Sequence, residues 1–478
     1  MTNSSSATGR LGQTIPGRAD TPARPAFTET IRLKLRVPAK LRNLELVLTI
    51  FAGLIVVFAI VLVQLGALGQ LFPHMIALGA ALGVLAIVMN VVQRFVAPEA
   101  DPFVIPVILL LNGIGIAEIY RIDIAKHLTG WESAGARQVA WTAMAMVLAI
   151  GVLVVIRNHR VLSRYRYVSM FVGIVLLLLP MLPGIGQTVN GARLWIHFGS
   201  FNFQPGELAK IALAIFFAGY LVTARDSLSM VGHKVLGIRF PRARDLGPIL
   251  VIWAAAMVVL IFQRDLGTAL LYFGLFLVMI YVATSRISWV ILGLTLFLGG
   301  AIVAGLTLNY VNGRFAAWLD AFNPKIYDAT GGSYQLVQGL FGLAHGGLLG
   351  TGLGQGRPSI VPLAESDYII ASLGEELGLV GLFAILCLYL LFVSRGFRIG
   401  FAGQDDFGRL LGVGLSFVIA LQVFIVIGGV TRVIPLTGLT TPFLAAGGSS
   451  LVANWIIAAL LLRLSDSVRS GPRVVVEA

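Results

Sequence analysis

Cysteine is nearly absent from this 478-residue sequence, and charged residues are scarce. Cys387 is the single cysteine, so no intramolecular disulfide can form and cysteine usage says nothing about the redox compartment. Charged residues make up 12% of the chain, hydrophobic residues make up 57%, and the mean hydropathy is +0.90. One water-soluble core cannot bury so much apolar surface. The composition therefore indicates a polytopic membrane protein.

The motifs of several enzyme classes are also missing. The sequence has no His-rich metal motif, Walker loop, Ser-His-Asp order or dinucleotide fingerprint. A net charge of +13 and a pI near 10.2 would suit a nucleic-acid-binding protein, but basic cytoplasmic loops that follow the positive-inside rule are the simpler explanation, so we expect no nucleic acid partner. The first long apolar run begins only near Leu44, which is unlike a cleaved secretory signal.

Twelve apolar runs are long enough to cross a bilayer, which takes about 17–25 residues each. They lie at 45–66, 73–93, 103–120, 137–156, 165–182, 207–224, 246–262, 266–284, 288–308, 366–394, 408–429 and 441–463. With both termini inside the cell, most of the 35 Lys and Arg residues fall on the cytoplasmic side, as the positive-inside rule requires. The sequence thus predicts an all-α, multi-pass protein of the cytoplasmic membrane.

Composition divides the chain into four parts. Residues 1–43 are rich in Ser, Thr, Pro and Arg, which is typical of a disordered basic cytoplasmic tail. Two transmembrane helices are predicted within 44–97, a core within 98–466, and a second cytoplasmic tail at 467–478. The core contains a long polar segment at 309–365, predicted to lie outside the cell. We expect it to be partly helical, because structureless loops of this length are uncommon in compact proteins.

Four carboxylates gather where this loop meets the next apolar run: Glu365, Asp367, Glu375 and Glu376. An acid at a membrane boundary costs little if it faces water and much if it faces lipid. One structural explanation is that Ser366 or Asp367 caps the helix. Capping does not explain the last two acids, which would lie about 12 Å further along that helix at about 1.5 Å per residue.

Several cations fall on the same predicted outer side. They are Arg137, Arg193, Lys210, Arg314, Arg357 and Arg432. Cations suit a phosphate or diphosphate, and carboxylates suit proton abstraction or a divalent metal. Together they predict chemistry on a lipid-linked pyrophosphate at the outer face of the membrane.

Each of these features has a structural alternative. Glu207 and Lys210, at i and i+3, could form an internal salt bridge or present a cation to an anionic substrate. Arg314 could be an interfacial anchor, and Asp265 could cap the next helix. The segment 432–450, rich in Pro, Gly and hydroxyl residues, could line a groove or form a packed turn.

Seven motifs follow one another through the core. They are NGARLWI (190–196), FQPGELAKI (203–211), QRDLGTAL (263–270), SYQLVQ (333–338), GGLLGTGLGQG (346–356), ESDYIIASLGEELGLVG (365–381) and GVTRVIPLTGLTTPFLAAGGSSL (429–451). In this order they resemble the RodA/FtsW family, the SEDS proteins. RVIPLTGLTTPF is most similar to the RodA type of actinobacteria.

The resemblance implies a bundle of ten core transmembrane helices, to which 44–97 adds two at the amino terminus. It also implies a peptidoglycan glycosyltransferase that polymerises lipid II into glycan strands outside the cytoplasmic membrane, for cell elongation or division. The implied partners are lipid II, the lipid-linked glycan strand and a class B penicillin-binding protein. The implied cofactor is a divalent cation, Mg²⁺ or Mn²⁺.

By the same resemblance the essential acid is Asp367. It would act as general base on the 4-hydroxyl of an acceptor sugar, with inversion at the donor carbon, and is a possible metal ligand. The predicted substrate-binding residues are Arg137, Arg193, Trp195, Glu207, Lys210, Asp265, Arg314, Gln338 and Glu375. Trp195 is otherwise an interfacial anchor.

Four positions depart from the family pattern. Arg264 stands for Pro, Gly339 for Ser, and Ala445-Ala446 for Ser-Tyr. Two other functions stay open: a flippase for the same lipid, or a non-catalytic scaffold for a penicillin-binding protein. A transporter is expected to place its polar sites near mid-membrane, whereas these candidates gather at one face.

Overall fold

The computed structural model describes residues 39–189, 191–198, 201–229, 234–235, 238–239, 251, 254–255, 258–259, 261–329 and 331–470. The long helices are α1 (Ala39–Leu68), α2 (Pro73–Val96), α3 (Val104–Ala125), α4 (Ala134–Val155), α7 (Pro205–Ser229), α9 (Leu266–Thr284), α10 (Ile287–Thr307), α14 (Ile369–Phe401), α15 (Asp406–Val430) and α16 (Gly448–Arg469). The short helices are η1 (Gly130–Glu132), α5 (Val161–Arg164), α6 (Arg166–Leu178), η2 (Leu179–Met181), α11 (Asn309–Leu319), α12 (Pro324–Tyr327), α13 (Tyr334–Gly346) and η4 (Pro358–Ile360).

Ten helices in the described residues are long and apolar enough to cross a membrane, and they coincide with ten of the twelve predicted runs. The run at 165–182 forms the shorter helix α6 and the turn η2. The run at 246–262 lies largely outside the described residues. The predicted helical bundle is therefore confirmed, and the count of twelve crossings stays a prediction.

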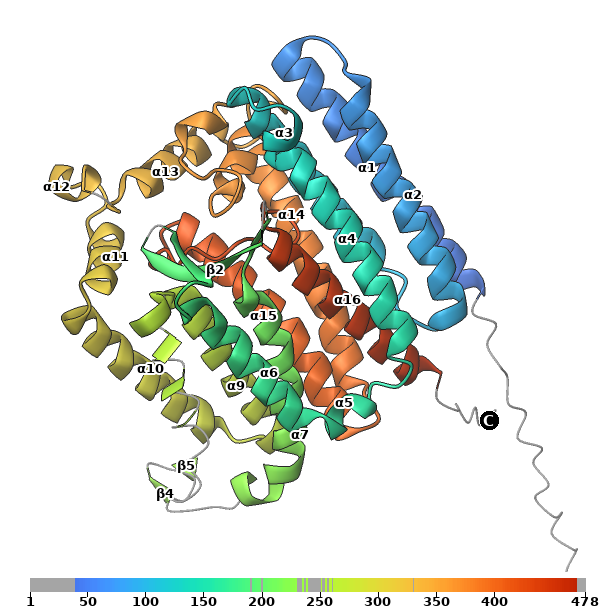
Figure 1. Ribbon diagram of the computed structural model, residues 1–478, viewed down its shortest axis with the longest axis vertical. Coiled ribbons are helices and arrows are strands. Elements are labelled where there is room, and N and C mark those ends of the chain that lie inside the picture. Colours follow the sequence, from blue (N-terminus) through green and yellow to red (C-terminus); the bar gives the residue numbers. More distant parts are fainter. Residues whose placement is uncertain are drawn as a thin grey trace, which may run out of the picture. The chain divides into compact units, whose positions relative to one another are not determined.

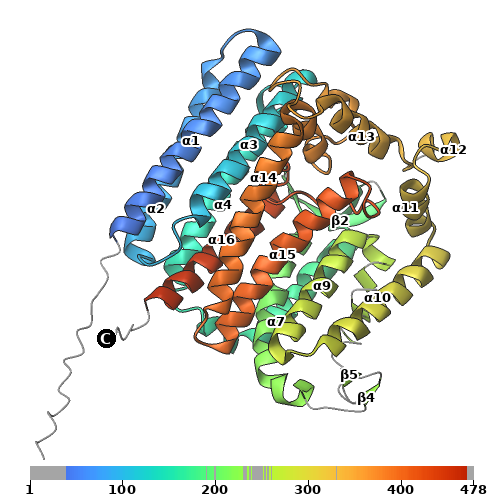
Figure 2. The same cartoon turned by 180° about the vertical axis from the view of Figure 1, so that it is seen from behind.

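The three C-terminal helices α14, α15 and α16 form the middle of the bundle (Figures 1 and 2). Helices α3 and α4 pack on one side of them, and α7 and α9 pack on the other. Helices α1 and α2 lie side by side against α3 and α4, while α10 packs on α9 at the far side. The 309–365 segment carries α11, α12 and α13, which connect the end of α10 to the beginning of α14 (Figure 1).

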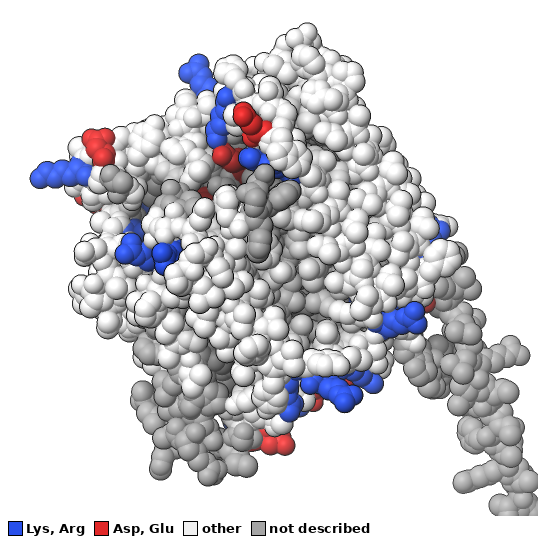
Figure 3. Space-filling view, viewed as in Figure 1, with Lys and Arg blue, Asp and Glu red and all other residues white. Residues whose placement is uncertain are grey.

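Charged side chains gather toward the two ends of the bundle, with a broad uncharged surface between them (Figure 3). One end carries Asp367 and is called the site end. The opposite end carries two further acids. Asp101 forms an ion pair with Arg469, and Asp405 Oδ1 lies 2.9 Å from His159 Nε2. This distribution suits a bundle that spans a bilayer, because charge is costly at membrane depth.

The structure has a small antiparallel sheet at the site end, which the all-α prediction did not include. Its strands are β1 (Gly186–Val189), β2 (Ala192–Phe198) and β3 (Phe201–Phe203), in the order β1-β2-β3. The hairpin pairs Thr188 with Arg193 and has Gly191 at its tip with φ +81°. A second, two-stranded ladder joins β4 (Lys234–Val235) to β5 (Ile238–Arg239).

Helix α14 is broken at Gly378, where φ is +67° and ψ is −173°. The loop before the helix fills the break. Leu379 N donates to Gly347 O at 3.0 Å, and Gly352 N donates to the carbonyl of Glu376 at 2.9 Å. Polar backbone groups freed inside an apolar bundle must find partners in the protein, and the loop supplies them.

The irregular segment 431–447, between α15 and α16, is held in the same way. Side chains from five helices donate to its carbonyl groups: Asn112 to Phe443 (3.0 Å), Gln138 to Ala445 (3.0 Å), Gln422 to Thr440 (2.9 Å), Arg314 to Leu436 (2.7 Å) and Tyr389 to Pro442. Phe443 is buried against Trp455, with ring centroids 6.4 Å apart. Residues 441–445 are therefore packed into the bundle, whereas Thr431, Val433 and Gly438 are exposed.

We predict that Gly378→Ala destabilises the folded protein by more than about 2 kcal/mol, because a left-handed non-glycine residue is strained and its Cβ overpacks the site. That Cβ would lie 2.2 Å from Gly350 N. Thermal unfolding of the purified protein measures the effect. Gly299→Ala is the control, since a Cβ there meets nothing within 4 Å. Equal melting temperatures for the two variants would contradict the prediction.

Candidate active site

Asp367 lies in the turn just before α14, whose first residue is Ile369. Its side chain is half-buried. Neither Ser366 nor Asp367 caps the helix, because no side chain makes a cap hydrogen bond there. The capping explanation for Asp367 is therefore wrong, and the carboxylate is available for another role.

Arg314 of α11 is the cation that accompanies Asp367. If Gly438 carried a Cβ, that atom would lie 3.6 Å from Asp367 Oδ2 and 3.9 Å from Arg314 Nη2, so the two side chains share the space over this glycine. Gly438 has φ +78°, a conformation that favours glycine. Arg314 is itself fixed by donating to Leu436 O at 2.7 Å.

Burial raises the pKa of Asp367 to about 6, and the Arg314 charge and the Ser366 hydroxyl oppose that rise. Burial likewise raises the pKa of Asp265, where hydrogen bonds from Thr268 and the charge of Arg314 oppose it. Arg314 thus acts electrostatically on both acids. A carboxylate with a pKa near neutrality is suited to accept a proton and release it again.

Asp265 also caps α9, as its structural alternative predicted. Its Oδ1 accepts from Thr268 N at 3.0 Å, and its Oδ2 accepts from the Thr268 hydroxyl. The neighbouring Arg264 has φ +57°, which proline cannot adopt, and its guanidinium lies 5.8 Å from the centre of the Tyr310 ring. Proline, the usual residue at this position in the family, could therefore not adopt the backbone conformation that Arg264 has here.

Lys210 is at the centre of a buried polar network. Its Nζ donates to Glu207 at 2.6 Å, to Asn454 at 2.9 Å and to Gln422 at 3.1 Å. Its exposed fraction is 2%, so all three ammonium donors are used inside the protein. The sequence left two roles open for Lys210, and the structure shows the internal salt bridge with Glu207. The network continues to Thr440 through Gln422 and so supports the segment that carries Gly438.

Glu375 and Glu376 point into the loop that precedes α14. Glu376 is 1% exposed and accepts from Arg121 Nε at 2.9 Å and from Gly354 N at 2.8 Å. Glu375 accepts from Arg357 N at 3.1 Å and lies 2.9 Å from His345 Nδ1. This pair organises the loop through backbone amides.

A third buried acid near this pair, Glu118, was not singled out from the sequence. Glu118 of α3 is fully buried and accepts from the Ser372 hydroxyl. The sequence contained a signal for this residue: Glu118 lies inside an apolar run, where an acid is rare without a function or a partner. Lys126, which pairs with Glu365 at 2.6 Å, was missed as well.

The other predicted substrate-binding residues are spread over the site end. Arg193 is exposed on β2 and donates to Thr188 at 3.2 Å, and Trp195 is partly exposed on the same strand. Gln338 of α13 donates to the Tyr327 hydroxyl at 2.9 Å. Arg137 is exposed near the start of α4. Among the predicted cations, Arg314 is seen to share the space over Gly438 with Asp367 and to lower its pKa.

Of the remaining departures from the family pattern, the one at Gly339 has a simple packing explanation. A Cβ on Gly339 would lie 2.7 Å from the Tyr368 ring, so the glycine lets this ring pack against α13. Ala445 is buried, and Ala446 N donates to Glu365 O at 2.8 Å, but nothing in the structure explains why alanine stands at these two positions.

The predicted divalent cation has few protein ligands available. No group of three His, Cys, Asp or Glu residues in the described part of the chain is placed to hold a metal ion. Asp265 is occupied by Thr268 and Glu365 by Lys126, which leaves Asp367 as the carboxylate at the mouth of the site. One carboxylate fits a Mg²⁺ ion that takes its other ligands from water and substrate phosphates.

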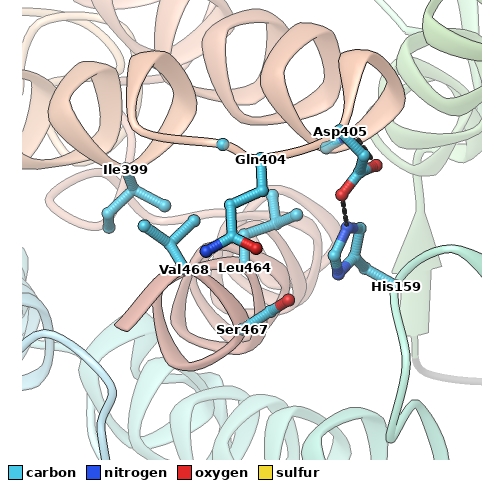
Figure 4. A pocket seen from close by; sticks show the side chains of 9 residues that line it. His159, Ile399, Gln404, Asp405, Leu464, Ser467 and Val468 are labelled. Carbon is cyan, nitrogen blue, oxygen red and sulfur yellow. Dashed lines mark hydrogen bonds and ion pairs between the residues drawn. The ribbon is translucent and has the colours of Figure 1, made fainter. Parts of the chain in front are cut away.

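Two cavities lie away from Asp367. One, of about 10 Å³, is enclosed by His159, Gln404, Asp405 and Ser467 at the opposite end and is large enough for about one water molecule (Figure 4). The other, of about 400 Å³, is apolar and lies between α6, α7 and α9. Its wall includes Ile174, Leu213, Phe216, Phe217 and Tyr272.

The fold and this site define a multi-pass membrane protein with an acid and a cation beside the same glycine at one end of its bundle. A family model described as a cell cycle protein, of the FtsW, RodA and SpoVE type, matches residues 101–470. The peptidoglycan glycosyltransferase RodA of Mycobacterium leprae (strain TN) is 42% identical over 452 residues, which cover 94% of this chain and 94% of that relative.

The peptidoglycan glycosyltransferase RodA of Mycobacterium tuberculosis (strain ATCC 25618 / H37Rv) is 44% identical over 431 residues, covering 90% of this chain and 91% of that relative. A chain of a peptidoglycan synthase complex has the same fold, with a TM-score of 0.61 and 24% identity over 78% of this chain and 99% of that one. The chain belongs to the FtsW/RodA/SpoVE family. The resemblance found in the motifs is thereby confirmed.

We predict that Lys210→Met lowers stability by about 3–5 kcal/mol, because it leaves Glu207 as an uncompensated buried charge. Adding Glu207→Gln to that variant should recover part of the loss. Thermal unfolding measures both, with Lys325→Met as the control at an exposed position. A melting temperature for Lys210→Met equal to that of the control would show that the network is dispensable.

Proposed function

We propose that this protein is a peptidoglycan glycosyltransferase that joins lipid II units into glycan strands at the outer face of the cytoplasmic membrane, with Asp367 as its general base. The relatives that match at 42–44% identity over at least 90% of the chain are named peptidoglycan glycosyltransferases. The activity expected from the motifs agrees with theirs. The observation that carries the assignment of the base is the half-buried, uncapped Asp367 beside Arg314.

In the proposed reaction the 4-hydroxyl oxygen of the acceptor sugar attacks the anomeric carbon of the donor. Asp367 takes the hydroxyl proton as the new C–O bond forms. The bond from the anomeric carbon to the lipid diphosphate breaks, and the diphosphate leaves with the bonding electrons. This single displacement inverts the configuration at the anomeric carbon.

Arg314 is positioned to stabilise the departing diphosphate, since a guanidinium can bind phosphate oxygens with two parallel hydrogen bonds. Arg193 on the exposed hairpin is a second candidate for this role. A divalent cation held by Asp367 and the substrate would add electrostatic stabilisation of the diphosphate. Lys210 contributes indirectly, by supporting the segment that carries Gly438.

The substrate is lipid-linked, and the apolar cavity between α6, α7 and α9 has the lining and size to take part of a hydrocarbon chain. The excess of Lys and Arg in the predicted inner segments supports cytoplasmic termini and a site that faces outside. The fold match to a chain of a peptidoglycan synthase complex supports association with a class B penicillin-binding protein.

Transport of the same lipid is the alternative. A flippase needs polar groups along a path across the membrane. The Asp367–Arg314 pair instead lies at one end of the bundle, and Lys210 is saturated by internal hydrogen bonds. Both observations favour chemistry at the surface over transport through the core.

Asp367→Asn should lower the rate of glycan polymerisation by about 10²–10⁴-fold, because it removes the proton acceptor while keeping the side-chain shape. Reconstitution with purified lipid II and gel analysis of the product strands measures this rate. Asp328→Asn, at an exposed position of the same loop, is the control. Polymerisation by Asp367→Asn at the rate of the control would refute the role of Asp367.

The pH profile should report the same carboxylate. Polymerisation should fall as pH drops through about 6, where Asp367 becomes protonated. Arg314 lowers the pKa of Asp367, so Arg314→Gln should move this acid limb to higher pH, whereas Arg314→Lys should keep it close to that of the unmodified protein. An acid limb that stays in place in Arg314→Gln would show that another group controls the profile.

A further inference from the structure

Helix α1 lies outside the residues matched by the family model, yet its C-terminal end touches the loop that leads into the site. The family model begins at residue 101. The alignment with RodA of Mycobacterium leprae covers 94% of this chain, which is too much to leave out α1 and α2. The two helices are therefore shared with this relative and are not part of the common family core.

The contact between α1 and the loop is made through glycine on both sides. A Cβ on Gly66 would lie 2.3 Å from Leu353 O, and a Cβ on Gly354 would lie 2.8 Å from both Ala67 N and Val63 O. Such distances leave no space for a side chain, so the two backbones are in direct contact. Leu353 adds an apolar contact with the cluster that contains Val63.

The same loop residues hold the buried acids. Gly354 N and Gly356 N donate to Glu376 at 2.8 and 3.2 Å, and Arg357 N donates to Glu375 at 3.1 Å. Both acids lie on the part of α14 between its start and the break at Gly378. Asp367 lies two residues before that part begins.

Helix α1 is itself fixed to the core. At its C-terminal end Gln64 accepts from Phe72 N at 2.9 Å and lies 3.4 Å from the Tyr120 hydroxyl of α3. At the other end Arg42 donates to Ala100 O. Helix α1 packs along α3, as Figure 2 shows. Helix α1 is therefore held to the core near both ends, and its C-terminal end supports the loop.

We propose that α1 is a positioning element of the active site: its contact through Gly66 fixes the loop 350–357, which in turn sets the Glu375–Glu376 pair and the part of α14 that follows Asp367. The inference rests on the proposed role of Asp367. Gly66 itself touches no substrate and acts on the site only through the loop 350–357.

The test uses the full-length protein with purified lipid II and compares Gly66→Val with Gly53→Val. Both variants place the same β-branched residue in α1, but a Cβ at Gly53 meets nothing within 4 Å. Gly66→Val should lower kcat by about 10–100-fold with little change in KM, because misplacing a catalytic group by a fraction of an ångström is costly. Gly53→Val should polymerise like the unmodified protein.

Hydrogen exchange supplies the second readout. In Gly66→Val the amides of Gly354, Gly356 and Arg357 should exchange faster, since their bonds to the two acids loosen, while they stay protected in Gly53→Val. If Gly66→Val does not fold, Leu353→Ala is judged by the same criteria, because it weakens the contact without adding bulk.

Equal kcat and equal amide exchange in Gly66→Val and Gly53→Val would overturn the proposal. So would a loss of activity in Gly66→Val that follows the loss of folded protein while the three amides stay protected. Failure of the proposed function is distinguishable, because it would appear as normal polymerisation by Asp367→Asn. An inactive Asp367→Asn together with a fully active Gly66→Val would reject the role of α1 alone.

Discussion

Backbone that is not helical can exist inside an apolar bundle only if the protein satisfies its polar groups, and this constraint shapes the site end of the molecule. The segment 431–447 receives side-chain donors from five helices, and the polar groups at the break near Gly378 are bound by both amides and carbonyls of the preceding loop. Once these bonds are made, neither segment can move without breaking several of them. Gly438 and the start of α14 are therefore held firmly, and with them the space that Asp367 and Arg314 share.

Buried charge follows the same rule, because an ion in this environment requires a partner. Lys210 and Glu376 illustrate it: each is almost fully buried, and each is bound by several groups from different elements. They link the bundle to the irregular segments. Asp367 differs from them, since it is half-buried, caps no helix and faces one arginine. The contrast separates the charges that hold the structure together from the charge available for chemistry.

Motif order and the long apolar runs were sufficient to predict the helical bundle and the family, whereas the role of Asp367 stays a prediction. They could not assign roles to the cations. Lys210 had two compatible roles, because i,i+3 spacing from Glu207 says nothing about Gln422 and Asn454, which are more than two hundred residues away in sequence. The small sheet was not predicted either, since its short strands carry a weak pattern. Glu118 stood in an apolar run as a visible signal, but its partner Ser372 comes from a distant helix.

The sequence by itself determined that this chain spans a membrane, to which family it belongs and where along the chain its acids and cations lie, because composition and local order are written in consecutive residues. Tertiary structure alone decided which of these charges meet. It brought Arg314 and Asp367 to the same glycine, Gly438, directed Lys210 into the core, and brought Gly66 of the first helix against Gly354 of the loop. The physical reason is that contacts between distant segments depend on how helices pack, and packing is set by the whole set of side chains at once.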